Sequence, residues 1–248
     1  MPKPPTLLVI SFFDARPAAA LAALLRSLRR RTAGAPYEIV IVANRTAAAP
    51  LALPEEAAGV RVLERANEGM NIAAWEHGWR QSPGFDRIVF LQDDCRIVRA
   101  GWLAAFAAAL DNPAIGLVGE SLNSAWDAPW DALRARHTDA LPGHGDGPRA
   151  DFYRACMARW GVDPGSTGRH LRSLVWAARR EVLERIGGFP VGRTYGECIA
   201  AEIAVSRKVE AAGLRIDQVD RRPFRYIAHA EWRRPHPFAR HRHLSMPA

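Results

Sequence analysis

Residues 90–95, with the sequence Phe-Leu-Gln-Asp-Asp-Cys, bring an amide and two carboxylates to the end of an apolar run. Successive side chains of an extended strand point to opposite faces, so Gln92 and Asp94 can share a site while Asp93 faces the other way. This spacing disfavours the paired carboxylates of a glycoside hydrolase. It favours Asp94 as an oxygen ligand of a hard divalent cation, with Gln92 beside it as a neutral oxygen ligand or hydrogen-bond donor. The alternative interpretation is that the two Asp residues only begin a turn.

Sequence signatures of several other enzyme classes are missing. There is no G-x-x-x-x-G-K-[ST], no H-E-x-x-H and no G-x-S-x-G segment, which argues against a P-loop NTPase, a zincin protease and an α/β-hydrolase. Residues 145–150 fit the pattern G-x-G-x-x-A, but they follow no predicted strand and contain a proline where a helix should begin. We therefore do not interpret them as a dinucleotide-binding fingerprint.

The residues that could do this chemistry need a scaffold, and the hydrophobic pattern predicts one. Apolar runs of strand length alternate with segments of helical periodicity. This alternation predicts an α/β fold with a mainly parallel central sheet and helices on both faces. In the first half we expect strands at residues 7–13, 38–42, 60–63, 87–91 and 115–118, with a helix after the first, third and fourth of them.

Polar residues gather where these expected strands end, before the next helix begins. They occupy residues 11–14, 43–45, 67–71 and 92–94. Ligands of open α/β sheets bind beyond the carboxyl ends of the strands. We therefore expect the functional site at this edge of the sheet.

The second half of the sequence interrupts the alternation. Residues 123–170 are rich in Gly, Pro and Asp and lack the apolar repeats that a separate core would need. We expect an elaborated loop region with short helices there, not another domain. Beyond it, the pattern predicts strands at residues 174–177, 214–219 and 226–228 and helices at residues 181–186 and 199–212.

The composition is that of a globular protein with a basic surface. The 248 residues carry 34 Lys and Arg against 26 Asp and Glu, a formal net charge of +8. This charge is compatible with nucleic acid, an anionic membrane surface or a phosphorylated substrate. Three widely separated cysteines argue against a disulfide scaffold or a structural zinc site. The sequence shows no signal-peptide pattern, and its apolar stretches are much shorter than the about 20 residues that a membrane span needs. We therefore expect a cytoplasmic protein.

Several short motifs follow one another in a fixed order along the chain. They are the first strand with Ser11, Phe12 and Phe13, then residues 38–44, 67–69, 90–103 and 179–189. Their order and spacing resemble those of the family 2 glycosyltransferases of GT-A fold, over residues 7–229. The resemblance implies a single GT-A-type domain at residues 1–232, with a nucleotide-binding half at about 1–120 and an acceptor and base half at about 121–232. A basic C-terminal tail at residues 233–248 follows.

The resemblance implies a nucleotide-sugar donor that lies across the strand ends. Its donor-binding positions are Ser11, Phe12, Phe13, Asn44, Arg45, Asn67, Gly69, Asn71, Gln92 and Asp93. Asp94 matches the second Asp of the family's D-x-D motif, which holds Mg²⁺ or Mn²⁺ on the diphosphate, and Gln92 stands where the first Asp would be. His229 is similar to the histidine that completes this site in some members. Ala43 stands where an Asp commonly contacts the nucleotide base.

The resemblance also implies an acidic base for the acceptor hydroxyl. Ala201-Glu202 looks like the family's Glu-Asp motif, so Glu202 is the candidate base, with Glu197 as the reserve. One base and a single displacement give inversion at the anomeric carbon. Trp126, Trp130 and Trp176 are candidates for stacking on the acceptor sugar, although Trp is mostly a core residue.

The expected partners are a nucleotide-sugar donor and a saccharide or lipid-linked acceptor, with the basic C-terminal part contacting the inner face of an anionic membrane. Two other functions stay open. The neutral residues Ala43 and Gln92 are compatible with a degenerate transferase that binds a nucleotide without turnover. The charge of +8 is compatible with a nucleic-acid-binding protein. Because the basic residues are dispersed and no nucleic-acid motif is present, we expect no nucleic-acid partner.

Overall fold

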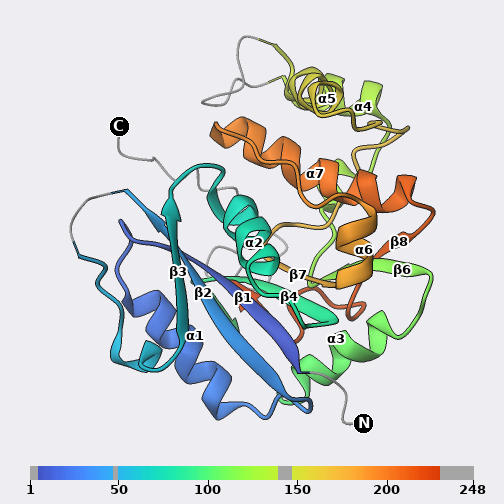
Figure 1. Ribbon diagram of the computed structural model, residues 1–248. Helices are drawn as coiled ribbons and strands as arrows, with labels where there is room; N and C mark the ends of the chain where they lie inside the picture. The colour runs from blue at the N-terminus through green and yellow to red at the C-terminus, as the bar shows by residue number, and fades with distance from the viewer. Residues whose placement is uncertain (1–4, 47–49, 139–146, 230–248) are drawn as a thin grey trace.

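The apolar runs of the first half form the parallel part of a seven-stranded sheet (Figure 1). The computed structural model describes residues 5–46, 50–138 and 147–229. The first four strands are β1 (Thr6–Phe13), β2 (Tyr37–Arg45), β3 (Arg61–Ala66) and β4 (Arg87–Gln92). They lie in the order β3-β2-β1-β4 and are all parallel. A parallel strand with both faces covered needs a continuous apolar run, and β1 is buried everywhere except at its last residue.

The remaining strands continue the sheet beyond β4. β7 (Val175–Arg179) runs antiparallel between β4 and β6 (Ile115–Gly119), and β8 (Arg215–Gln218) runs parallel to β6. The full order is β3-β2-β1-β4-β7-β6-β8, so β7 is the reversed strand of this sheet. The mainly parallel α/β fold expected from the sequence is confirmed.

A second, two-stranded sheet lies just beyond the carboxyl end of β4. After Gln92 the chain turns at residues 93–94 and enters β5 (Cys95–Ile97), which pairs antiparallel with β9 (Ile227–His229). The register puts Cys95 opposite His229. The sequence predicts β9 but not β5, because three residues are too few to show a periodic pattern.

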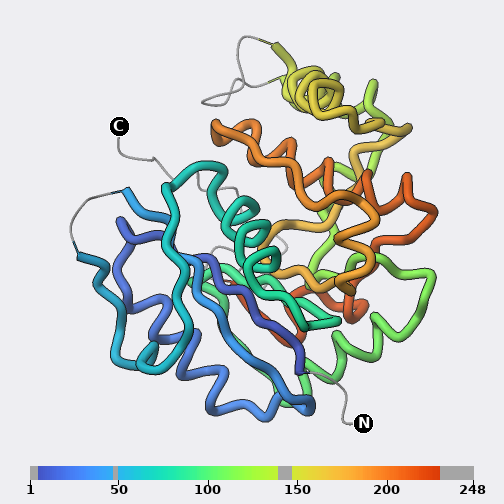
Figure 2. The backbone as a smooth tube through the Cα atoms, in the orientation of Figure 1, coloured from blue at the N-terminus to red at the C-terminus, as the bar shows by residue number. Residues whose placement is uncertain are grey.

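Helices cover both faces of the large sheet, as expected. α1 (Ala19–Arg30) and α3 (Trp102–Leu110) bury their apolar sides against one face, while α2 (Met70–Arg80), α6 (Arg180–Arg185) and α7 (Tyr195–Ala211) pack on the other. Two 3-10 helices, η1 (Glu55–Ala57) and η2 (Ser124–Trp126), lie in connections. Figure 2 shows α7, in orange, beside α2, which brings the late part of the chain next to the early strands.

Residues 123–138 and 147–170 form a further layer outside α7 (Figure 1). α4 (Trp130–Arg136) and α5 (Arg149–Arg159) pack with α7 around a cluster that contains Trp126 and Tyr153. Ala200, Ile203 and Ala204 of α7 complete this cluster. The described part of the segment has the expected short helices, and its apolar residues share a cluster with α7. That the segment is not a separate domain stays a prediction.

α7 begins earlier than the predicted residues 199–212 because a capping box starts it. The Thr194 hydroxyl accepts from the backbone N–H of Glu197, and the Glu197 carboxylate accepts from the backbone N–H of Thr194. Such a cap stabilises a helix by about 0.5–2 kcal/mol. Just before it, a Cβ on Gly192 would meet backbone atoms of Glu197 and Cys198 at 2.4 and 2.6 Å, so only glycine fits.

Each helix in the described part of the chain is too short or too polar to cross a lipid bilayer. The large sheet takes strands from both sides of residue 120, so the expected nucleotide and acceptor halves share one sheet. Their separate roles stay a prediction. The basic tail expected at residues 233–248 lies outside the described residues.

Candidate active site

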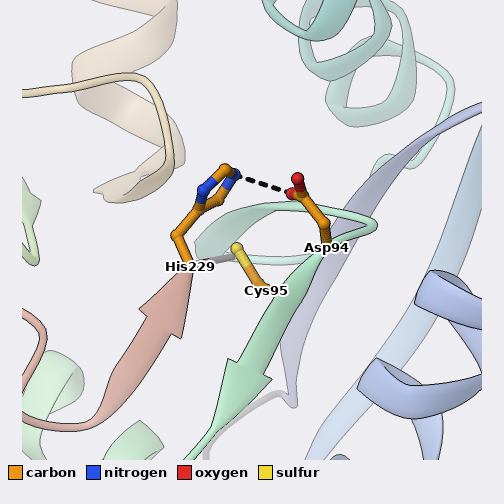
Figure 3. Close-up of side chains that lie close together, drawn as sticks. All are labelled: Asp94, Cys95 and His229. Atoms are coloured by element: carbon orange, nitrogen blue, oxygen red, sulfur yellow. Dashed lines mark ion pairs between the residues drawn. The ribbon is translucent and has the colours of Figure 1, made fainter. Parts of the chain in front are cut away.

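The carboxyl end of β4 and the end of β9 meet at one histidine (Figure 3). Nε2 of His229 lies 2.7 Å from Oδ1 of Asp94 and 3.2 Å from Oε1 of Gln92. His229 is buried. Gln92 and Asp94 therefore approach the same atom, as the alternation of side chains predicts, although the chain turns at Asp93. The pairing of β5 with β9 produces this meeting, because it fixes His229 opposite Cys95.

The proton on Nε2 of His229 lies between two acceptors. The Gln92 amide nitrogen donates to the backbone carbonyl of Ser173 at 2.7 Å, so its oxygen, which can only accept, faces His229. The Asp94 carboxylate is also only an acceptor. Burial raises the pKa of Asp94, but the hydrogen bond and charge of His229 and the charge of Arg16 outweigh it, so the net pKa lies below its usual value. The Nε2 proton is therefore the group that a bound cation would displace.

The donor atoms at this point fit a hard divalent cation. A carboxylate oxygen, an amide oxygen and an imidazole nitrogen converge, and such a set suits Mg²⁺ or Mn²⁺. Cys95 is close by, with ligand atoms of Asp94, Cys95 and His229 all within 4.8 Å of one another. Burial raises the pKa of Cys95 well above its usual value, and its thiol donates to the Leu174 carbonyl at 3.4 Å. A thiol is a soft ligand that Mg²⁺ and Mn²⁺ do not favour, so Asp94, His229 and Gln92 are the groups that we consider for a hard cation.

Asp93, in the turn after β4, joins the ends of β4 and β1. Its buried carboxylate accepts the backbone N–H of Phe13 at 3.3 Å. Burial and the charge of Asp94 raise the pKa of Asp93 to about 6, against the effect of the Phe13 hydrogen bond. Ser11 donates to a backbone carbonyl of β4 at 3.4 Å, and Phe12 lies in the core. Of the three expected residues of β1, only Phe13 is partly exposed.

The ends of β2 and β3 present further polar groups at the same edge. Asn44, which is buried, donates to the Met70 carbonyl at 3.1 Å and accepts from Arg65 at 2.6 Å. Nε of Arg45 lies 3.0 Å from Oδ2 of Asp14. Both expected donor-binding residues of β2 are thus held in place by side chains or backbone from neighbouring segments.

Three expected residues lie where β3 leads into α2, with Asn67 and Gly69 in the connection and Asn71 in the first turn of α2. Asn67 is exposed. Gly69 has φ +72°, and a Cβ there would lie 2.5 and 2.7 Å from two side chains, so the left-handed backbone and the close packing both favour glycine. Asn71 donates to the Ser173 carbonyl at 2.7 Å. Asn71 therefore contacts the carbonyl that also receives the Gln92 amide.

Glu202 of α7 lies at the other end of the same chain of contacts. Oγ of Ser173 donates to Oε2 of Glu202 at 2.5 Å, and Nε2 of His170 lies 3.0 Å from Oε1. Because the Ser173 carbonyl receives the Gln92 amide, the contacts run without a break from Glu202 to His229. Burial raises the pKa of Glu202, but the hydrogen bond and charge of His170 and the hydrogen bonds from Ser173 lower it more. Glu202 is thus an ionised carboxylate with 16% of its side chain exposed.

Glu197, the reserve base, has a different environment. Its carboxylate accepts the backbone N–H of Arg193 at 2.7 Å and pairs with Arg159 at 2.6 Å, in addition to its part in the capping box. The Arg193 hydrogen bond is the largest cause that lowers the pKa of Glu197. These contacts explain Glu197 as a helix cap, whereas Glu202 is the carboxylate that the contacts join to the strand ends.

The three tryptophans considered for acceptor stacking are core residues. Trp176 is 0% exposed and packs against Trp75 with ring centroids 5.3 Å apart. Trp126 and Trp130 are also buried, and Trp126 stacks on His137 at 4.5 Å. A sugar can stack only on an accessible ring face. Burial of these rings in apolar clusters corrects the expectation that they contact the acceptor.

Three residues of the site are absent from the sequence-based set. Arg16 pairs with Oδ2 of Asp94 at 3.5 Å, and His170 and Ser173 come from the segment before β7. The sequence holds one indication of this arrangement, since Ser173 directly precedes a predicted strand. It does not reveal that this strand is reversed, which is the reason that Ser173 reaches the carboxyl end of β4.

Comparisons with known proteins agree with the fold. No family model matches the sequence, and no curated protein matches it. Among solved structures, a mannosyltransferase from Pyrobaculum calidifontis in complex with GDP-Man and Mn2+ matches with a TM-score of 0.51 and 16% sequence identity. The match covers 87% of this chain and 55% of that chain, so this chain spans about half the length of that structure. At this identity the likeness shows an α/β fold of GT-A type, and membership of family 2 stays a prediction.

Proposed function

We propose that this protein is a glycosyltransferase, which moves a sugar from a nucleoside-diphosphate sugar to an acceptor hydroxyl with inversion and with the help of Mg²⁺ or Mn²⁺. The observation that carries the proposal is the unbroken chain of contacts from Asp94 and His229 through Gln92 and Ser173 to Glu202. It joins a set of cation ligands to an ionised carboxylate at the carboxyl edge of the sheet, where ligands of such folds bind. The GDP-Man and Mn2+ of the similar mannosyltransferase support the class of donor and the cation.

The donor half of the proposed site is built on the strand ends. Asp94, His229 and the Gln92 oxygen would hold the cation, which stabilises the negative charge that builds on the leaving nucleoside diphosphate. Arg16, 3.5 Å from Asp94, adds a positive charge at the same edge. Asn44, Arg45 and the other polar residues of these strand ends are the groups that we assign to the rest of the donor.

Glu202 is the group that we assign as the general base. Its carboxylate takes the proton of the acceptor hydroxyl while the acceptor oxygen bonds to the anomeric carbon. The bond between that carbon and the diphosphate oxygen breaks, and its electron pair leaves on the diphosphate. Attack on the face opposite the leaving group inverts the configuration. Contacts with Ser173 and His170 fix the orientation of the carboxylate, and its partial exposure leaves it accessible.

Thermal unfolding with a panel of nucleotides tests the donor half. UDP, GDP, ADP, CDP and dTDP are each added with and without Mn²⁺. We expect at least one of them to raise Tm only when the metal is present, because a ligand that binds the native state stabilises it. The matching nucleotide sugars are then assayed for release of the nucleoside diphosphate in the presence of saccharide acceptors. No shift with any nucleotide would contradict the proposal.

A nucleotide-binding protein without turnover is the second candidate. Gln92 supplies an amide where a second carboxylate would strengthen cation binding, and Arg16 offsets part of the charge of Asp94. Both features reduce the attraction for a divalent cation. Metal-dependent stabilisation by a nucleotide, without release from any nucleotide sugar, would favour this candidate over the transferase.

The acceptor and the cellular location belong to the proposal as predictions. We propose a saccharide or lipid-linked acceptor and a cytoplasmic protein that contacts an anionic membrane through residues 233–248, which lie outside the described residues. Sedimentation with anionic liposomes tests the contact. Absence of binding at low salt would remove the membrane from the proposal and leave the transfer reaction unaffected.

A further inference from the structure

His170 contacts the proposed base, Glu202, and the partners of its two ring nitrogens indicate which of them carry a proton. The residue is 1% exposed. Its Nδ1 lies 2.7 Å from the carbonyl oxygen of Gly168, which only accepts, so Nδ1 carries a proton. Its Nε2 lies 3.0 Å from Oε1 of Glu202 and 3.2 Å from the side-chain amide of Asn123. The protonation of Nε2 therefore decides the charge of the pair.

A second proton must lie between His170 and Glu202. Without it, a lone pair on Nε2 would face a lone pair of the carboxylate across 3.0 Å in a buried site, where unsatisfied polar contacts are costly. The Asn123 amide nitrogen faces Nε2 at 3.2 Å, while its Oδ1 is buried with no hydrogen-bond partner among the described residues. Turning the amide over brings Oδ1 to Nε2–H and gives this oxygen a donor, in agreement with a protonated Nε2.

We propose that His170 is the positioning residue of the general base, sharing its Nε2 proton with Glu202 so that the carboxylate stays ionised and fixed in orientation. The inference rests on the proposed function, because it concerns the same reaction. Before transfer the pair holds one shared proton, and after transfer it holds that proton and the one taken from the acceptor hydroxyl. His170 itself does not touch the acceptor in this scheme. Its effect passes through Glu202.

Other charged groups also face the pair. Arg172, from the same segment, experiences the charge of Glu202, which opposes the lowering of the Arg172 pKa by burial. On α5, burial raises the pKa of Tyr153, and the Glu202 charge acts in the same direction. Because Arg172 retains part of the positive field, a substitution of His170 shifts the ionisation of Glu202 without making it impossible.

Two amide variants separate the two contacts of the His170 ring. His170→Asn puts a nitrogen near the position of Nδ1, so it can keep the bond to Gly168 and loses the contact with Glu202. His170→Gln does the opposite, since its nitrogen stands near the position of Nε2. When kcat is measured against pH, its acidic side reports the ionisation of Glu202. In His170→Asn we expect this side to move to higher pH by about 1–3 pH units, because Glu202 loses a neighbouring cation and its pKa rises. In His170→Gln the displacement is smaller, and KM for the donor stays near the wild-type value in both.

The matched control is His137→Asn, a change at another histidine of the same layer, where the ring stacks on Trp126. We expect the acidic side of its kcat profile to coincide with that of the wild type. A uniform loss of kcat in His170→Asn without displacement of the acidic side would overturn the proposal and leave His170 with a structural role only. Thermal unfolding of each variant shows whether it is folded.

A second measurement does not need activity. The ¹⁵N chemical shifts of the His170 ring at neutral pH are recorded in the wild type and in Glu202→Gln. We expect two protonated nitrogens in the wild type and one, Nδ1, in the variant. A singly protonated ring in the wild type would overturn the proposal. If no nucleotide sugar is turned over, the proposed function fails while this measurement still decides whether His170 and Glu202 share a proton.

Discussion

Oδ1 of Asp94 and Nε2 of His229 lie 2.7 Å apart because Asp94 directly precedes β5, whose first residue, Cys95, pairs with His229 of β9. The meeting of carboxylate and imidazole is therefore set by strand register and not only by side-chain attraction. Because the backbone sets these positions, changing one of the two side chains should abolish binding of the proposed cation while the protein stays folded.

Asp94→Asn tests this expectation. An amide oxygen can still accept the Nε2 proton of His229, so we expect little change in the Tm of the protein alone. The negative charge that a divalent cation needs is lost. We therefore expect stabilisation by nucleotide and Mn²⁺ to disappear, a loss of about 2.7 kcal/mol where the ligand is present at 100 times its Kd. An unchanged metal-dependent shift, measured by thermal unfolding, would remove Asp94 from the proposed cation site.

Gln92→Asp restores the D-x-D spacing and should nevertheless impair the protein. The Gln92 amide donates to the Ser173 carbonyl and thereby joins the cation ligands to the residue that holds Glu202. A carboxylate cannot donate, and the buried carbonyl then keeps only the Asn71 bond, at a cost of about 1–3 kcal/mol. We expect lower Tm and lower kcat. Gln92→Glu is the matched variant, because it keeps the length of the side chain and removes only the N–H donor. A wild-type kcat in both variants would refute the role of Gln92 as the link between the proposed cation ligands and Ser173.

Glu120 should make the protein less stable as pH rises through the neutral range. This buried residue accepts the backbone N–H groups of Tyr226 and Ile227 at 3.1 and 2.7 Å, directly before the end of β9. Burial is the largest cause that raises the pKa of Glu120, from 4.5 to about 7. The folded state thus binds this proton more tightly than the unfolded state. Its stabilising effect is fully present below about pH 4.5 and is lost as pH rises to about 7.

Urea unfolding from pH 4.5 to 8 measures this effect. We expect the free energy of unfolding of the wild type to fall relative to that of Glu120→Gln by about 3 kcal/mol over this range. The raised pKa of Asp93 acts in the same direction in both proteins, so it cancels in the difference. Parallel curves for the two proteins would show that Glu120 does not titrate in this range.

Glu197 and Glu202 should respond differently to the same change. Glu197→Gln retains an amide oxygen for the backbone N–H groups but removes the charge that pairs with Arg159. We expect a loss of stability of about 1 kcal/mol or less, since the pair is partly exposed. Glu202→Gln removes the proposed base, and we expect kcat to fall by at least about 10²-fold. Lost transfer in a folded Glu197→Gln, with retained transfer in Glu202→Gln, would reverse the assignment.

The fold follows from the sequence to the extent that its elements are long and periodic. The short continuous runs in β1, β2 and β4, rich in Val and Ile, favour buried strands, and α1 shows a clear apolar stripe. β5 could not be predicted, because three residues are too few to show a periodic hydrophobic pattern. The direction of β7 could not be predicted either, since an apolar run has the same pattern in a parallel and in an antiparallel strand.

The candidate site follows from the sequence only where its residues are next to predicted strand ends. Gln92 and Asp94 could be foreseen as neighbours from the alternation of one strand. Two other contacts join segments that are far apart in the chain. They are the contact of His170 with Glu202 and that of Ser173 with Gln92. Such pairings depend on strand order and helix packing, which a single sequence does not state.

The reversal of β7 has a consequence for how the chain can change over time. Because this strand enters the sheet from the carboxyl edge, residues just before it arrive at the reaction edge whatever the length of the segment that precedes them. The chain between Asn123 and Gly168 can thus lengthen, shorten or exchange its helices while His170 and Ser173 keep their places against Glu202 and Gln92. One strand of opposite direction thus separates a segment that can vary in length from the strand ends that hold the proposed site.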